Sequence, residues 1–168
     1  MQDRECEEII EMAEGPSVCA PSEEHAEHPA LAVQEQCAYG IRVRLQVPYD
    51  EALSRMRHLL GENGFVITGE TDVRELMQAR LGIMYPQYTI LDVCDPDILH
   101  QCLELDRDLG LLLPHHVIVY EQSGGSVIAA IDTMAQIALA DGRDLTSLAR
   151  TTKEKLRDVI NRVAAGAG

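Results

Sequence analysis

GIRVRLQV, at residues 40–47, alternates apolar and polar side chains along its whole length. A period of two is typical of a β-strand with one buried face and one face in water. The central strands of a doubly wound parallel sheet are apolar throughout instead. The stretch therefore predicts an α+β fold, in which a mostly antiparallel sheet has helices packed on one face.

The chain after this strand switches to helical periodicity. Pro48 ends the strand, and apolar residues then recur at helical spacing until a glycine-rich stretch closes the helix. Residues 65–68 read as a second strand. A short helix capped by Thr71 or Asp72 follows, because both side chains can accept a hydrogen bond from the first turn.

A strand at residues 88–94 leads directly into the next helix. Asp95 is a favoured N-cap and Pro96 a favoured first helical residue, so the pair predicts a helix start at this point. Residues 116–121 and 126–131 are then two β-rich runs, and a Gly-Gly pair between them indicates a hairpin.

Two helices complete the expected order, which is β-α-β-α-β-α-β-β-α-α. A short helical segment covers residues 134–140, and the last helix begins near Asp144 with one apolar stripe along it. A chain of 168 residues suits one domain. We expect that domain to span residues 39–168.

Residues 1–38 form an acidic leader that we expect to be only partly ordered. They hold ten acidic residues and one basic residue, which is most of the chain's net charge of −14. Residues 2–14 could fold as a short acidic helix. The stretch after Pro16 shows no sustained periodicity, and such a composition favours disorder over a packed core.

The charge and the cysteines exclude several classes of protein. Nucleic acids and anionic membranes recruit clustered Lys and Arg, which this acidic chain lacks. The acidic start does not resemble a signal peptide, and no apolar run is long enough for a transmembrane helix. Five irregularly spaced cysteines indicate reduced thiols, so we expect a cytoplasmic protein.

Four segments carry a resemblance to a known family. They are VPYDEALSRMRHLLGENGF (47–65), TGETDVRELMQARLG (68–82), YTILDVCDP (88–96) and LGLLLPHHVIVYE (109–121). In this order and spacing the chain resembles the bacterial and archaeal family called domain of unknown function 302. The resemblance implies a small α+β domain that associates as a homodimer, and it brings no established activity.

One position departs from the pattern of that family. Cys94, Asp95 and Pro96 match its Cys-x-Pro turn, whereas the Cys that often follows its Leu-Pro pair is His115 here. These two positions therefore cannot form a dithiol in this chain.

Cys94 is the first candidate for chemistry, because it lies where a strand meets a helix. Amides at a helix N-terminus can lower the pKa of a thiol, although the charge of Asp95 opposes this effect. The alternative interpretation is a buried, inert cysteine at a strand end.

His115 and His116 are the next candidates, at the entry to a strand. Adjacent strand residues point to opposite faces, so only one imidazole can share a pocket with Cys94. Cys94 and His115 together could hold a transition metal or haem, and all three residues are candidate contacts for a small ligand. Otherwise the histidines are ordinary polar residues at a strand edge.

The leader offers a weaker metal site. His25 and His28 would share one helical face, and Cys6, Cys19 and Cys37 lie around them. Their spacing fits no zinc-finger pattern, and a solvated tail explains the composition equally well.

Three functions remain after these observations. The first is a homodimeric module that binds a metal, haem or small ligand near Cys94 and His115. The second is an interaction protein whose acidic leader recruits a basic partner. The third is a thiol-dependent redox protein with Cys94 as the nucleophile.

Overall fold

The computed structural model describes residues 33–138 and 145–166. Six strands form one sheet in the order β1-β2-β6-β5-β4-β3, and every neighbouring pair is antiparallel. The strands are β1 (Val33–Cys37), β2 (Gly40–Leu45), β3 (Val66–Asp72), β4 (Tyr88–Cys94), β5 (His115–Gln122) and β6 (Gly125–Ile131). The α+β class and the antiparallel sheet are thus confirmed.

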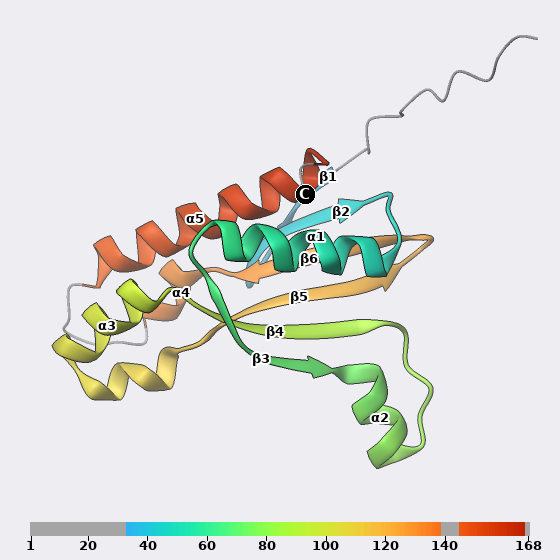
Figure 1. Ribbon diagram of the computed structural model, residues 1–168, viewed down its shortest axis with the longest axis horizontal. Coiled ribbons are helices and arrows are strands. Elements are labelled where there is room, and N and C mark those ends of the chain that lie inside the picture. The colour runs from blue at the N-terminus through green and yellow to red at the C-terminus, as the bar shows by residue number, and fades with distance from the viewer. Residues whose placement is uncertain (1–32, 139–144, 167–168) are drawn as a thin grey trace, which may run out of the picture.

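Five α-helices and one 3₁₀-helix accompany the sheet in the described ranges. They are α1 (Tyr49–Glu62), α2 (Val73–Leu81), α3 (Pro96–Leu105), η1 (Arg107–Leu112), α4 (Thr133–Ile137) and α5 (Thr146–Ala164). Figure 1 shows α1 and α5 lying across one face of the sheet, while α3, η1 and α4 gather at one end of it. The predicted element order is confirmed, with β1 and η1 as additions.

The sheet begins earlier than the sequence suggests. β1 pairs with β2 along its full length, from Val33 opposite Arg44 to Cys37 opposite Gly40. The last residues of the expected leader therefore form an edge strand. The short helix expected at residues 2–14 and the candidate ligands Cys6, Cys19, His25 and His28 lie outside the described residues.

The main core lies between the sheet and the two long helices. Leu156 and Ile160 of α5, Met56 of α1 and Val117 and Val119 of β5 are fully buried in it. The apolar stripe predicted for the last helix is confirmed, since every fourth or third residue of α5 faces this core. Burial of these side chains is the main force that holds the helices on the sheet.

The hairpin between β5 and β6 follows the predicted glycine signal. Its two loop residues, Ser123 and Gly124, have φ angles of 49° and 77°. Positive φ at both positions makes a tight turn whose twist matches that of the two strands.

α2 is the exception to this packing. None of its residues is buried, and its main contacts are with β3 and β4. Figure 1 shows it standing away from the other helices beyond the end of β3. Two of its apolar residues, Leu76 and Leu81, are exposed. In the described part of the chain no helix is long and apolar enough to span a bilayer.

A buried leucine and an exposed one provide a test of this core. Leu156→Ala removes a fully buried side chain, and we expect a loss of about 2–5 kcal/mol in the free energy of unfolding. Leu111→Ala, at a position that is 88% exposed, should change it by less than about 0.5 kcal/mol. Urea denaturation followed by circular dichroism measures both, and equal losses would contradict the assigned core.

Candidate functional site

A small apolar cavity lies where α3, η1, α4 and α5 meet the start of β5. About 40 Å³ of it can hold the centre of a water molecule. Its walls are mainly leucine, isoleucine and alanine, with four polar side chains among them. The lining residues are Ile98, Cys102, Leu109, Leu112, Leu113, His115, Thr133, Gln136, Ile137, Leu145, Leu148, Ala149 and Thr152.

His115 lines this cavity, and its hydrogen bonds determine which ring nitrogen carries the proton. Its Nδ1 is 3.0 Å from Oε1 of Gln136, and Nε2 of Gln136 donates to the carbonyl oxygen of Leu112 at 2.8 Å. A carbonyl can only accept, so the second bond fixes which end of the Gln136 amide faces the ring. His115 must then donate from Nδ1, which leaves a lone pair on Nε2.

Burial keeps this imidazole neutral. His115 is only 8% exposed, and burial lowers its pKa even though the hydrogen bond with Gln136 acts in the opposite direction. The charge of the neighbouring His116 lowers the pKa further. Nε2 is therefore a hydrogen-bond acceptor, or a ligand for a metal, at neutral pH.

The other polar side chains of the cavity already have partners. The hydroxyl of Thr133 donates to the carbonyl of Ala149 at 2.7 Å, and that of Thr152 donates to the carbonyl of Leu148 at 3.0 Å. The imidazole ring of His115 makes no further hydrogen bond within the described ranges. The cavity thus offers one principal acceptor, Nε2 of His115, on an otherwise apolar wall.

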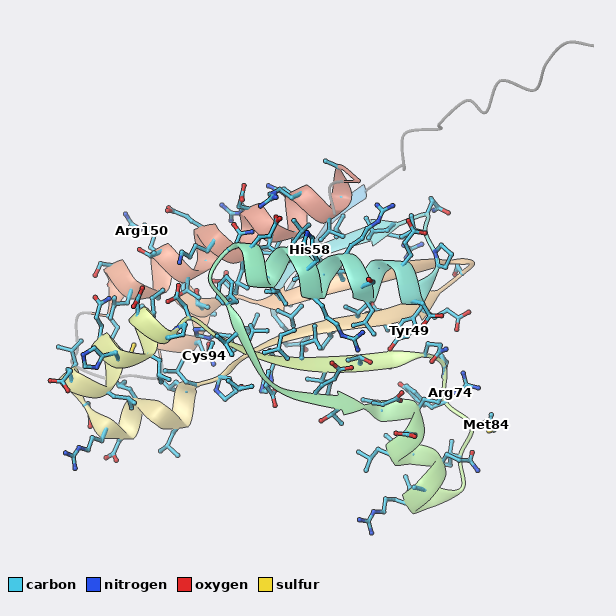
Figure 2. The ribbon with its side chains drawn as sticks, in the orientation of Figure 1. Tyr49, His58, Arg74, Met84, Cys94 and Arg150 are labelled. Carbon is cyan, nitrogen blue, oxygen red and sulfur yellow. The ribbon has the colours of Figure 1, made fainter. Side chains whose placement is uncertain are left out.

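Cys94 lies near this cavity but does not line it. Figure 2 shows it at the end of β4, beside α3. It is 4% exposed, and its Sγ is 3.9 Å from the carbonyl oxygen of Asp95. The cysteine that does line the cavity is Cys102, on α3.

The thiol of Cys94 is not activated. Burial raises its pKa, and the charges of Asp95 and Cys102 act in the same direction. The amides of Asp97 and Ile98, which could have stabilised a thiolate, donate instead to the carboxylate of Asp95 at 3.0 and 3.3 Å. The structure thus gives the opposite of the lowered pKa that the helix start suggested, and a neutral buried thiol is a poor nucleophile.

The β4–β5 register separates the two histidines. His115 lies opposite Val93 and His116 opposite Asp92, so their side chains point to opposite faces of the sheet. His116 is exposed and its Nδ1 is 2.8 Å from Oδ1 of Asp92. As the strand alternation predicts, only His115 lies on the side of the helices.

Two lysines of α5 hold the walls of the cavity. Lys153 donates to Asp132, the N-cap of α4, at 2.6 Å, and Lys155 donates to Asp95, the N-cap of α3, at 2.5 Å. Burial alone would raise the pKa of Asp95, but the bond from Lys155 and those from the helix amides lower it overall. Both carboxylates are therefore charged at neutral pH and tie α3 and α4 to α5.

The described ranges hold no group of three or more His, Cys, Asp or Glu side chains arranged for a metal ion. A structural zinc site needs four ligands and a catalytic one usually three. A metal at His115 would therefore bind through one or two protein ligands.

Comparison with known proteins gives the family. The sequence pattern described as domain of unknown function DUF302 matches residues 41–163. The chain belongs to the DUF302 family. No curated protein matches this DUF302 chain.

A solved structure shares the fold. It is described as the crystal structure of an uncharacterized conserved DUF302 protein from Bacillus stearothermophilus, with a TM-score of 0.69 and 21% identity. The match covers 75% of this chain and 98% of that one. At this identity the likeness shows a common fold, and the chemistry of the site has to be argued from the residues of this chain.

Sequence reasoning identified His115 but missed its surroundings. Gln136 lies 21 residues away in a short helix, and nothing in its neighbourhood singles it out. Cys102 could have been found, because it follows Ile98 by one helical turn and shares its buried face.

The buried imidazole predicts a pH dependence of stability. The folded pKa of His115 is lowered, so the unfolded chain binds the proton more tightly. The contribution of His115 is then complete above the unfolded pKa of about 6.5 and is lost as pH falls towards the folded pKa. We expect the drop in unfolding free energy between pH 7.5 and 5.5, measured by urea denaturation, to be smaller in His115→Gln than in the native chain. The exposed His58→Gln should keep the native slope, and an unchanged slope in His115→Gln would contradict the assignment.

Proposed function

We propose that this DUF302 domain is a homodimeric module that binds a small ligand at His115. The ligand places an apolar group in the cavity and donates one hydrogen bond to Nε2 of His115. The observation that carries this proposal is the chain of hydrogen bonds from Leu112 through Gln136 to His115, which presents a single lone pair on an apolar wall. Small-molecule sites commonly combine an apolar lining with a few fixed polar groups.

The size of the cavity limits the buried part of the ligand. One water needs roughly 10–15 Å³ measured in this way, so the cavity of about 40 Å³ has room for a group of a few heavy atoms. A larger ligand would leave its remaining atoms at the mouth of the cavity. Haem as a whole is far larger than this volume, so it would need the helices around the cavity to separate.

A transition metal is the second candidate ligand, because His115 has the geometry of a metal-binding histidine. In such residues the N–H of one ring nitrogen donates a hydrogen bond to a neighbouring acceptor, and the other ring nitrogen coordinates the metal. Cys94, as first expected, or the cavity residue Cys102 would supply a thiolate. Either thiol has a raised pKa from burial, so the metal would have to displace its proton.

The α2 arm, defined as residues 73–85, supplies the surface proposed for the dimer. Its exposed apolar residues are Leu76, Leu81, Ile83, Met84 and Tyr85. A helix of nine residues is marginally stable in water unless another surface packs against it. A second copy of the chain would bury this patch, and the association implied by family membership favours that partner.

A series of linear alcohols tests the ligand site. From methanol to pentanol, the dissociation constant should fall about three- to fourfold per methylene until the cavity is full. His115→Leu should weaken alcohol binding about fivefold and leave binding of alkyl chlorides of the same length nearly unchanged. NMR titration of the full chain, with His58→Leu as control, measures these constants.

Two results would overturn the ligand proposal. One is equal, unsaturable shifts for every alcohol, which would mean that no cavity is being filled. The other is about one equivalent of transition metal in protein purified without chelator, lost in His115→Leu. That second result would favour the metal site instead, and a further loss in Cys94→Ala or Cys102→Ala would identify the thiolate.

Charged residues introduced into the α2 arm test the proposed dimer surface. The native protein should have twice the 18.6 kDa mass of one chain. Leu81→Asp combined with Met84→Asp should reduce the mass to that of one chain. Leu111→Asp, on a different exposed surface, should leave the dimer intact. Light scattering after size-exclusion chromatography measures the mass, and a doubly substituted chain that stays dimeric would exclude the α2 arm as the interface.

A further inference from the structure

A second hollow lies on the face of the sheet opposite α1 and α5. It has a volume of about 190 Å³ and is lined by Cys37, Tyr39, Gly40, His116, Ile118, Ala129, Ala130 and Ile131. It shares no lining residue with the cavity at His115. The two sites are therefore separate, and this one does not depend on the function proposed above.

Strand register aligns the residues of this hollow in one row. Asp92 lies opposite His116, Gly40 opposite Ile131, and Cys37 opposite Gly40. Val117 pairs with Ala130, so His116 takes the next position of the ladder, beside Ile131. Residues opposite one another in antiparallel strands share a face, so one row runs from Asp92 through His116, Ile131 and Gly40 to Cys37.

A glycine in the row allows β2 to pair closely with β6 beside the hollow. Gly40 carries no side chain, and a Cβ there would lie 1.9 Å from the carbonyl oxygen of Ala130. No other residue fits at this position without moving the backbone. The hollow is thus built into the pairing of β2 with β6.

A second glycine sets the orientation of His116. Gly69 lies opposite Asp92, at a register irregularity in β3, and a Cβ there would lie 2.7 Å from Oδ2 of Asp92. The missing side chain makes room for the carboxylate, whose Oδ1 is 2.8 Å from Nδ1 of His116. A carboxylate accepts the Nδ1 proton, so in the neutral ring Nε2 keeps its lone pair.

We propose that this hollow binds a small aromatic compound that carries a hydroxyl group, as a phenol does. The apolar side chains of Ile118, Ala129 and Ile131 cover the ring, and Nε2 of His116 accepts the hydroxyl proton. A hollow of about 150 Å³ is sufficient for benzene, so this one has room for a single substituted ring.

The residues at the two ends of the row, Cys37 and Asp92, favour a phenol-like ligand. The sulfur of Cys37 makes favourable contacts with the edge of an aromatic ring. The carboxylate of Asp92 lies next to His116, at the end of the hollow that meets the hydroxyl group, so it disfavours a carboxylate or phosphate at that position. An amine could also donate to Nε2, which makes the amine a necessary comparison.

Phenol is the probe for the experiment, with the uniformly ¹⁵N-labelled full chain. We expect a saturable shift of Nε2 of His116 in a ring-nitrogen correlation spectrum at pH 7.5. Benzene should bind about five- to tenfold more weakly than phenol, because it lacks the hydrogen bond. Benzoate should show no saturable shift at all.

Two variants locate the binding, followed in the same titration by the backbone amide shifts of β5 and β6. Ala129→Leu fills the hollow and should abolish phenol binding, while His116→Phe should remove the preference for phenol over benzene and keep the apolar walls. His100→Ala and His115→Leu should both leave the affinity for phenol unchanged. Melting curves confirm that each variant is folded.

Several outcomes would overturn the proposal. These are no saturable shift of His116, an equal affinity for phenol and benzene, and phenol binding that survives Ala129→Leu. Tighter binding of benzylamine than of phenol would also overturn it, because the site would then recognise cations. Loss of phenol binding in His115→Leu alone would place phenol in the other cavity.

Discussion

The pairing of β4 with β5 is the constraint on which both proposed sites depend. Val93 opposite His115 and Asp92 opposite His116 form two successive steps of one antiparallel ladder. Because side chains alternate along a strand, a shift of one residue would exchange the two imidazoles between faces. It would also move Val117 and Val119 out of the core, so burial of the core fixes the register, and the register places the histidines.

The two histidines then differ through their partners and their burial. His115 donates to a neutral amide inside an apolar wall, and burial holds its ring neutral. His116 donates to the carboxylate of Asp92 on an exposed face. One strand therefore presents two imidazoles, one buried and one exposed, and each has its lone pair at a separate hollow.

Short-range patterns in the sequence are sufficient to predict most of the fold. The alternation in β2, the Asp95–Pro96 helix start and the glycine turn before β6 each follow from short-range chemistry, and each is found where it was expected. β1 was missed because its residues continue the composition of the acidic leader, and its partner strand lies after it. The sites required contacts over more than twenty residues, such as that of Gln136 with His115, which no local pattern reveals.

Cys94 shows how contacts between distant residues determine the reactivity of a side chain. The helix start was identified correctly, but the amides that could stabilise a thiolate bind the cap Asp95, and Lys155 holds that carboxylate in place. The same lysine thus fixes a wall of the cavity and supports the cap that occupies those amides. The fold positions a side chain at the start of β5, and the residue at that position determines what the cavity can bind.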